Sequence, residues 1–386
     1  MRYTHLLIGR SLLLCALVLF PLLTRSASVP DAAAQPPAYN KSSPFGIVAA
    51  LGNRVREDEL DTAVGLLREA GVQWQREEIF WDRVQKAPGG PFIWNGDGSG
   101  FYNYDRAIGA QVAAGINVLG LLDYNPYWFK SKNPHPDEWI EDWGNYVYAT
   151  VAHYGRDKGW ITYWELWNEP NVRASGYESG LYEIKDFVRL LEVGRAAAQA
   201  ADPNAIIVMG GMSGLTQIDA EYSYDALTYL DEVGKLGGWQ HVDIIALHPY
   251  HPAPPEGHIQ RFDRTVTLQD ELRQLDVLME RYGHKPVWLT ELGWTTSSTP
   301  PGVSEIDQAL YLVRAYLLAL AHPTVEKLFW YDFRNDTDPN APYTRPRYDA
   351  ANYEFHYGLL RRSYPLRPAM LACANRALWP SAPCLA

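Results

Sequence analysis

Residues 163–169 read Tyr-Trp-Glu-Leu-Trp-Asn-Glu, an apolar run that ends on a polar pair. The run 163–167 has the length and composition of a buried β-strand. After it, residues 181–201 carry apolar side chains at helical spacing, which predicts an amphipathic helix. A buried strand followed by a helix is the unit from which parallel α/β sheets are built, so this stretch indicates the fold class.

The same unit recurs along the chain from Pro44 onward. Short apolar runs predict strands at 45–51, 72–76, 117–122, 163–167, 205–210, 242–247, 286–290 and 327–331. Helical patterns lie at 58–70, 104–114, 137–154, 181–201, 222–234, 267–282 and 304–321, and a further helix is predicted at 367–378. This alternation predicts an α/β protein with a (β/α)8 TIM barrel, in one domain over residues 44–386. A doubly wound open sheet is the alternative, but it would need a glycine-rich phosphate loop after the first strand, where residues 51–54 read Leu-Gly-Asn-Arg.

Composition limits the classes of partner. The chain of 386 residues is 47% hydrophobic and 20% charged, which is typical of a globular protein. Its formal net charge of -11 argues against nucleic acid or an anionic membrane as a partner, because both require a basic surface. The 14 Trp and 25 Tyr residues supply many flat apolar faces.

The amino-terminal region is predicted to lie outside the fold. Residues 1–28 combine flanking arginines, an apolar run at 11–23 and small residues at 26–28, which predicts a signal peptide and a secreted protein. A membrane attachment would follow only if this segment stayed uncleaved. Residues 29–43 are rich in Ala and Pro and predict a flexible linker. In an exported protein Cys373 and Cys384 would form a disulfide or remain two free thiols.

Polar residues gather where the predicted strands end, which is where a barrel of this kind carries its active site. They are Arg76, Asp123, Tyr124, Asn168, Glu169, Ser213, His248, Tyr250 and Glu291, together with the aromatic pair Trp330 and Tyr331. Two glutamates that converge on one mouth suit the cleavage of a glycosidic bond, because one carboxyl must donate a proton while the other stays ionised. Aromatic rings beside them suit the apolar faces of sugars.

Residues 167–171 read Trp-Asn-Glu-Pro-Asn at the end of the fourth predicted strand, and 290–294 read Thr-Glu-Leu-Gly-Trp at the end of the seventh. This pattern resembles clan A of the glycoside hydrolases, and within it families 39 and 5. The resemblance implies a retaining enzyme in which Glu169 is the general acid/base and Glu291 the nucleophile, with carboxyl groups about 5–5.5 Å apart. It also implies that Asn168 bonds the sugar 2-hydroxyl.

The same resemblance implies supporting roles for other residues. Tyr250 would hold the nucleophile and Arg76 would keep it ionised. Trp330 would form the floor of the sugar subsite, and a cis peptide bond between Trp330 and Tyr331 would turn its indole toward the sugar. Strand alternation also points Glu165 into the barrel. A buried carboxylate needs a partner, and pairing of Glu165 with Arg76 would weaken the link from Arg76 to the nucleophile.

The remaining candidates leave alternatives open. His248 is expected to donate hydrogen bonds at the sugar-binding mouth, while Asp123 and Tyr124 are candidate walls of the subsite or ordinary packing residues. His248, His251 and Asp123 could instead form the metal site of a metal-dependent barrel hydrolase.

The sequence therefore predicts a retaining β-glycosidase that acts on polysaccharides or oligosaccharides of the xylan or glucan type. No cofactor and no metal are expected, and a monomer is the expected state. Besides the metal-dependent hydrolase, a barrel that binds glycans without cleaving them is an alternative. The presence of both Glu169 and Glu291 favours the enzyme.

Overall fold

The structure, a computed structural model, describes residues 43–124, 126, 128, 138–172, 183–214, 224–261, 264–337 and 349–361. The predicted signal peptide, the predicted linker up to residue 42, the predicted helix at 367–378 and both Cys373 and Cys384 lie outside these residues.

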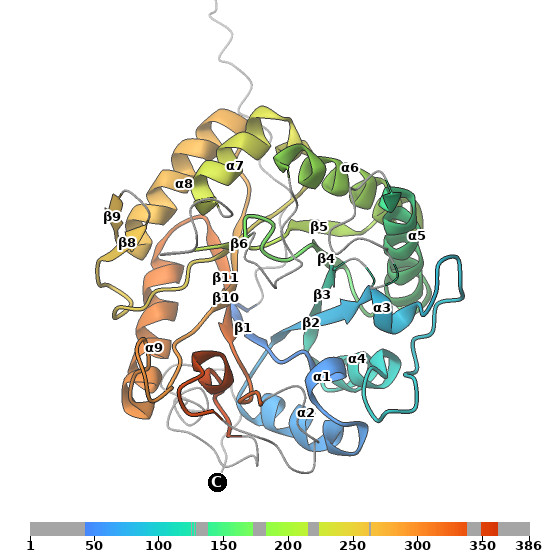
Figure 1. The fold of residues 1–386 in the computed structure, drawn as a ribbon, viewed down its shortest axis with the longest axis horizontal. Helices are drawn as coiled ribbons and strands as arrows, with labels where there is room; N and C mark the ends of the chain where they lie inside the picture. Colours follow the sequence, from blue (N-terminus) through green and yellow to red (C-terminus); the bar gives the residue numbers. More distant parts are fainter. Residues whose placement is uncertain are drawn as a thin grey trace, which may run out of the picture. The chain divides into compact units, whose positions relative to one another are not determined.

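A curled sheet of nine parallel strands forms the centre of the fold (Figure 1). Its strands are β1 (Phe45–Val48), β2 (Trp74–Phe80), β3 (Asn117–Asp123), β4 (Tyr163–Leu166), β5 (Ile206–Met209), β6 (Met212–Ser213), β7 (Ile245–His248), β10 (Val287–Leu292) and β11 (Val325–Tyr331). The order in the sheet is β5-β4-β3-β2-β1-β11-β10-β7-β6. The first strand therefore lies between β2 and the last strand, with Phe45 opposite Leu328.

The ring closes between β5 and β7. A parallel bridge joins Val208 to Ile244, and the backbone N–H of Met209 donates to the carbonyl of Ile244 at 2.9 Å. Beyond Met209 the chain continues into β6, where Ser213 pairs with His248 of β7. These contacts complete the barrel and confirm the (β/α)8 prediction.

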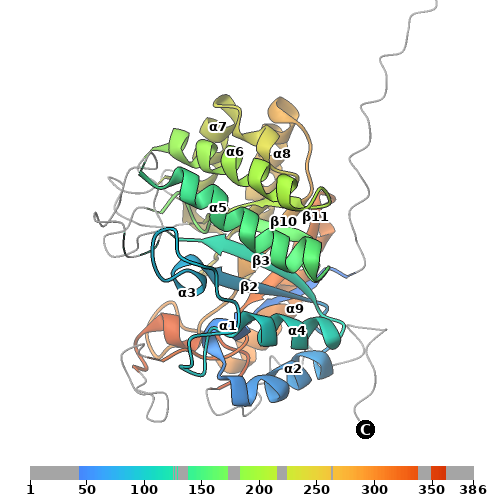
Figure 2. The same cartoon turned by 90° about the vertical axis from the view of Figure 1, so that its right-hand side faces the viewer.

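Helices surround the barrel (Figure 1), and α5 and α6 pack along one flank of it in the side view (Figure 2). The helices are α1 (Leu51–Arg54), α2 (Leu60–Glu69), α3 (Trp81–Val84), α4 (Tyr104–Ala113), α5 (Ile140–Val151), α6 (Ile184–Ala201), α7 (Ala226–Lys235), α8 (Leu268–Tyr282) and α9 (Glu305–Ala321). A π-helical turn follows α5 at Ala152–Asp157, and short 3-10 turns lie at Glu57–Glu59, Gly238–His241 and Tyr353–His356. Within the described ranges no helix combines the length and apolarity that crossing a membrane would need.

Side chains of the strands alternate between two apolar cores. The inner core fills the barrel with Val48, Trp74, Leu119, Tyr163, Val208, Ile244, Ala246, Trp288 and Phe329. The outer core lies between strands and helices and holds most other buried apolar residues. This alternation follows from the strand period of two, and it decides which residue at each strand end can reach the mouth of the barrel.

Candidate active site

A cavity of about 650 Å³ lies at the carboxyl ends of the strands. Among the described residues that line it are Val48 of β1, Arg76 of β2, Tyr124 after β3, Glu169 after β4 and Glu291 of β10. Aromatic side chains form much of its wall: Phe80, Tyr124, Tyr250, Trp294, Tyr331, Tyr353 and Tyr357. A cavity with aromatic walls and a few convergent polar groups is typical of a small-molecule site.

Arg76 connects three acceptors beneath the cavity. Its Nε donates to Oε2 of Glu165 at 2.6 Å, one terminal nitrogen donates to Oε1 of Glu291 at 2.5 Å, and the other donates to Oδ1 of Asn168 at 2.9 Å. The expected pairing with Glu165 is therefore present, but it does not displace the bond to Glu291. The planar guanidinium has enough donors for all three acceptors. Asn168 in turn donates from Nδ2 to the hydroxyl of Tyr124 at 3.0 Å.

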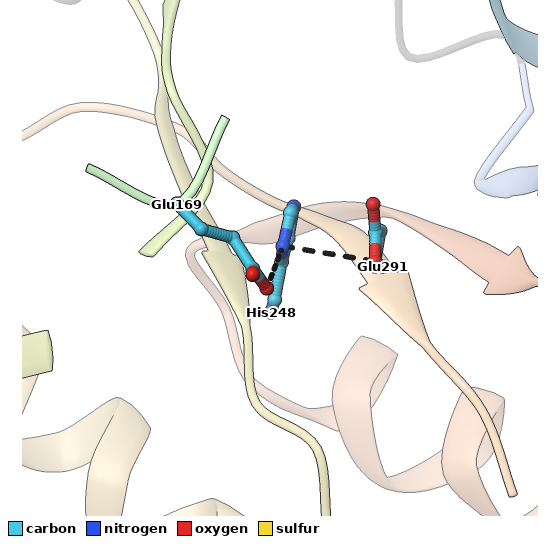
Figure 3. Close-up of side chains that lie close together, drawn as sticks. All are labelled: Glu169, His248 and Glu291. Carbon is cyan, nitrogen blue, oxygen red and sulfur yellow. Dashed lines mark hydrogen bonds and ion pairs between the residues drawn. The ribbon is translucent and has the colours of Figure 1, made fainter. Parts of the chain in front are cut away.

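His248 lies between the two glutamates (Figure 3). Its Nδ1 is 2.9 Å from Oε1 of Glu169 and 3.8 Å from Oε2 of Glu291. One ligand-type atom from each of these three side chains lies within 4.8 Å of the other two, so an oxygen of Glu169 and an oxygen of Glu291 are within that distance of each other. His248 itself is fully buried.

Glu291 is held in its ionised form. Burial alone would raise the pKa of Glu291, but His248, the guanidinium of Arg76 and the hydroxyl of Tyr250 outweigh burial and lower that pKa below its usual value. Tyr250 donates to Oε2 of Glu291 at 2.7 Å, and burial together with the charge of Glu291 raises the pKa of Tyr250, so the phenol keeps its proton. An ionised carboxylate in such a pocket can act as a nucleophile.

Backbone geometry brings Glu169 to this position. Glu169 has φ of 45° and Trp167 has φ of 74°, so the backbone at both residues lies in the left-handed region, which residues other than glycine rarely adopt. The backbone N–H of Glu169 donates to the carbonyl of Gly211 at 3.0 Å, which fixes the turn. Gly211 cannot be replaced without movement, because a Cβ there would lie 2.1 Å from Nε2 of His248. Non-glycine residues in this conformation cluster at functional sites.

Most of the predicted site residues line the cavity, namely Arg76, Tyr124, Asn168, Glu169, Tyr250 and Glu291. His248 does not line it but contacts Glu169 from behind. Asp123 is fully buried, and burial followed by the nearby charge of Glu78 raises its pKa well above the usual value. The structure therefore places Asp123 behind the wall of the cavity and not at its surface.

Trp330 requires a correction. It was predicted to form the floor of the subsite, but its side chain is 1% exposed, belongs to the outer core and stacks on Trp294 at 5.7 Å. Tyr331 lines the cavity in its place. The predicted cis peptide bond is also wrong by one residue, because it joins Tyr331 to Asp332. The error is one of strand phase: Phe329 packs in the inner core, so its neighbour Trp330 faces outward.

The structure adds cavity residues that the sequence did not indicate. Strand β2 extends to Phe80, so Glu78 and Phe80 share the inward face with Arg76. The predicted strand ended at residue 76. Had it been extended by four residues, the two-residue alternation of side chains would have placed Glu78 and Phe80 on the same face as Arg76. Glu354 and Tyr357 come from the segment after β11, which has no periodic pattern. Burial, together with the charges of Glu169 and Glu291, raises the pKa of Glu354 to about 7.

The alternative metal site of His248, His251 and Asp123 is not brought together. Within the described ranges, the side chains of metal-ligating types that lie close together are Glu169, His248 and Glu291 (Figure 3), of which His248 hydrogen-bonds Glu169 and lies 3.8 Å from Glu291. His251 lines the cavity near the carbonyl of Ala253, 3.2 Å from its Nδ1, and burial lowers the pKa of His251 to about 4.

Comparison with solved structures places this architecture among known enzymes, while no protein-family profile and no curated protein sequence matches the chain. A family 39 glycoside hydrolase of the gut symbiont Bacteroides cellulosilyticus WH2 superposes with a TM-score of 0.64 at 24% identity, over 86% of this chain and 62% of that chain. A family 5 subfamily 18 enzyme of Streptomyces cattleya, solved with Manβ1-4GlcNAc, gives 0.64 at 14% identity, over 87% and 80%.

A family 1 β-glucosidase of Thermotoga maritima gives a TM-score of 0.60 at 14% identity, over 86% of this chain and 97% of that chain. The present chain thus spans less than two thirds of the length of the Bacteroides enzyme but nearly all of the Thermotoga one. At these identities the likeness concerns the fold. The chain has the (β/α)8 fold of clan A glycoside hydrolases, and enzymes of families 39, 5 and 1 are its structural neighbours.

Proposed function

We propose that this protein is a retaining β-glycosidase that hydrolyses O-glycosidic bonds of polysaccharides or oligosaccharides, of the xylan or glucan type, by double displacement. The observation that carries the proposal is the pair of carboxyl groups at the cavity, with Glu169 and Glu291 oxygens within 4.8 Å of each other. Retaining enzymes place these groups about 5–5.5 Å apart, whereas inverting enzymes need roughly 6.5–9.5 Å to admit a water between them.

In the first step a carboxylate oxygen of Glu291 attacks the anomeric carbon and forms the glycosyl ester. The glycosidic C–O bond breaks, and Glu169 gives its proton to the departing oxygen. In the second step Glu169, now a carboxylate, takes a proton from water as that water attacks the anomeric carbon. The ester bond breaks and the free sugar leaves with its original anomeric configuration, while Glu291 returns as a carboxylate.

The surroundings support this division of roles. Arg76 and Tyr250 each place a donor on Glu291, and these bonds favour the charged nucleophile. Asn168 is fixed by Arg76 and Tyr124 beside both glutamates, where it can meet a sugar hydroxyl. We also propose that the protein is exported and monomeric, which sequencing the amino terminus of the secreted form and measuring its mass in solution would test.

The decisive experiment is hydrolysis of aryl β-glycosides with product stereochemistry followed by proton NMR. The β-anomer should form first, and appearance of the α-anomer as the first product, before mutarotation, would overturn the retaining mechanism. Glu291→Gln should remove turnover on all substrates, because no ester can form. Glu169→Gln should still release an acidic phenol such as dinitrophenol in a burst, followed by a slow rate that azide restores.

Exhaustive chelation separates this proposal from a metal-dependent hydrolase. The two carboxyl groups provide acid and nucleophile themselves, so the rate of the chelated enzyme should match that of the untreated enzyme. A loss that added metal restores would favour the metal-dependent alternative.

A further inference from the structure

The hydroxyl of Thr290 lies behind His248 and fixes where hydrogens can sit in the site. Its Oγ1 is 3.0 Å from Oε1 of Glu165 and 3.0 Å from Nε2 of His248. All three side chains are fully buried. A hydroxyl carries a single hydrogen, so Thr290 can donate to only one of these two neighbours.

Glu165 decides which neighbour receives that hydrogen. Its Oε2 accepts from Arg76 at 2.6 Å, and its Oε1 accepts from the backbone N–H of Gly211 at 3.0 Å. A carboxylate surrounded by a guanidinium and a backbone N–H is an acceptor, so its contact with Thr290 requires the hydroxyl to donate to Glu165. The hydrogen of the Thr290 hydroxyl therefore points to Glu165, and only the lone pairs of Oγ1 are available to His248.

The consequence for His248 follows directly. Nε2 must carry a hydrogen to bond Oγ1 of Thr290. In a neutral imidazole the other nitrogen, Nδ1, then has no hydrogen and is an acceptor. Oε1 of Glu169 lies 2.9 Å from Nδ1. Two bare acceptors at this distance would repel each other, so the contact holds one proton, carried by Glu169 when the imidazole is neutral.

We infer that Thr290 is a positioning residue that locks His248 with its hydrogen on Nε2 and thereby keeps a proton at the contact between His248 and Glu169. This inference rests on the proposed function, since a retained proton is what the first half of the reaction requires of Glu169. It assigns Thr290 a role through the Glu165–Thr290–His248–Glu169 chain without contact to the sugar.

Other charged groups face the hydrogen-bonded series Glu165–Thr290–His248–Glu169 and act on the proton between His248 and Glu169. Glu291 of β10 lies 3.8 Å from Nδ1 of His248, and its negative charge also favours a proton there. Arg76 of β2 bonds Glu165, at the opposite end of this hydrogen-bonded series. Glu354 of the Tyr353–His356 turn lines the same cavity and feels the charge of Glu169. Replacing Thr290 removes none of these three charges.

The test compares Thr290→Val with Thr290→Ser and with Thr150→Val. Valine preserves the shape of threonine but removes the acceptor, so His248 can move its hydrogen to Nδ1 and bond an ionised Glu169. The basic limb of the pH profile of kcat/KM should then shift about one unit to lower pH, with a loss of about 10- to 100-fold on poor leaving groups. Dinitrophenyl substrates should lose little. Thr290→Ser should resemble the wild type.

Thr150 is the matched control because it is also fully buried and bonds the carbonyl of Tyr146 at 2.8 Å, remote from the cavity. Thr150→Val should leave the pH profile unchanged. Equal losses on good and poor leaving groups in Thr290→Val, without a shift of the profile, would mean a merely structural role and would overturn the inference.

A measurement on the wild type makes the test independent of turnover and of the folding of any variant. Nitrogen-15 NMR of histidine-labelled protein, with the His248 signals assigned by His248→Gln, reports which ring nitrogen carries hydrogen. Hydrogen on Nε2 alone supports the inference, and a doubly protonated ring overturns it, because the proton would then be on Nδ1 and not on Glu169. A bare Nε2 with hydrogen on Nδ1 overturns it, while leaving the glycosidase proposal intact. Failure of all glycosides to react would instead overturn the proposed function.

Discussion

Tyr250 shows how one residue sets the pKa of another, since its phenol donates a hydrogen bond to Glu291, the carboxylate that must stay ionised. It donates at 2.7 Å to Oε2 of Glu291, and its ring also meets Tyr331 and Tyr357 edge-on. Its own backbone is held from outside, because Arg261 donates to the carbonyl of Tyr250 at 2.8 Å. Tyr250 is therefore fixed at both ends, and removing its hydroxyl changes one bond without releasing the loop.

Tyr250→Phe should raise the pKa of Glu291, because one of the groups that lower it is lost. The acidic limb of kcat/KM should move to higher pH, since a larger share of Glu291 is protonated and inactive. The rate at the optimum should fall about tenfold or more, as expected when a hydrogen bond to a charged group is removed. Tyr282→Phe is the matched control, because Tyr282 donates at 2.8 Å to Asp231 away from the cavity. An unmoved acidic limb would contradict this role of Tyr250.

At the residue scale the sequence indicated chemistry better than orientation. Glu169 and Glu291 could be singled out because acidic residues directly follow or end apolar runs. Trp330 and Tyr331 could not be told apart, because both are aromatic and the phase of a fully buried strand leaves no polar alternation to read. Glu165 could be placed inside the barrel by strand alternation and its pairing with Arg76 anticipated, but Thr290 carries no separate signal, since its role depends on partners on other strands.

At the scale of elements, each predicted strand overlaps a strand of the barrel, because buried parallel strands are compact β-prone runs. The hairpin of β8 (Ile259–Arg261) and β9 (Arg264–Val266) was missed, since three-residue strands are too short for a pattern. It nonetheless matters for the site. Arg261 is 1% exposed and bonds Glu271 of α8 at 2.6 Å as well as the backbone of Tyr250.

Helix α8 offers a test of element stability through its first turn. Thr267 and Asp270 form a capping box in which Asp270 accepts from the backbone N–H of Thr267 at 2.9 Å. That bond, the hydroxyl of Thr267 and Arg273 lower the pKa of Asp270 to about 2. Because the folded state binds the proton less tightly than the unfolded state, the stabilisation is present above about pH 4 and is lost as pH falls toward 2.

Asp270→Asn should therefore lower the free energy of unfolding at pH 7, by about 1 kcal/mol or less at such an exposed cap. The difference from wild type should shrink as pH falls from about 4, which urea unfolding at several pH values would measure. Glu280→Gln, which removes the same charge from the far end of α8, is the control for the loss of charge alone. A constant difference across the range would contradict the assignment.

At the scale of the molecule, the barrel is held together by its inner core, which contains a buried cation. The amine of Lys327 lies 4.4 Å from the ring of Trp74 and 5.2 Å from that of Trp288, and it donates to the carbonyl of Ser43 at 2.9 Å. Burial lowers the pKa of Lys327 to about 8, although the charge of Glu326 opposes the shift. The wall of the barrel was predictable from apolar runs, but a charge inside it was not.

Lys327→Met tests this arrangement through the pH dependence of stability. The unfolded state keeps the lysine proton up to about pH 10, whereas the folded state loses it near pH 8, so the unfolded state holds more protons between these values. The free energy of unfolding of the wild type should therefore rise across this window relative to Lys327→Met. Chemical unfolding at pH 7, 8, 9 and 10 would measure the difference, and a flat difference would refute it.

The pairing of β1 with β11 has a consequence for how quickly activity can appear. The residues that meet, Phe45 and Leu328, are separated by most of the described chain, and Glu169 and Glu291 belong to units in between. Such distant pairing is slow to form, while helices form from local contacts. During refolding the helical signal should therefore recover before enzymatic activity does. A chain whose barrel has not yet closed would have most of its helical structure but no activity.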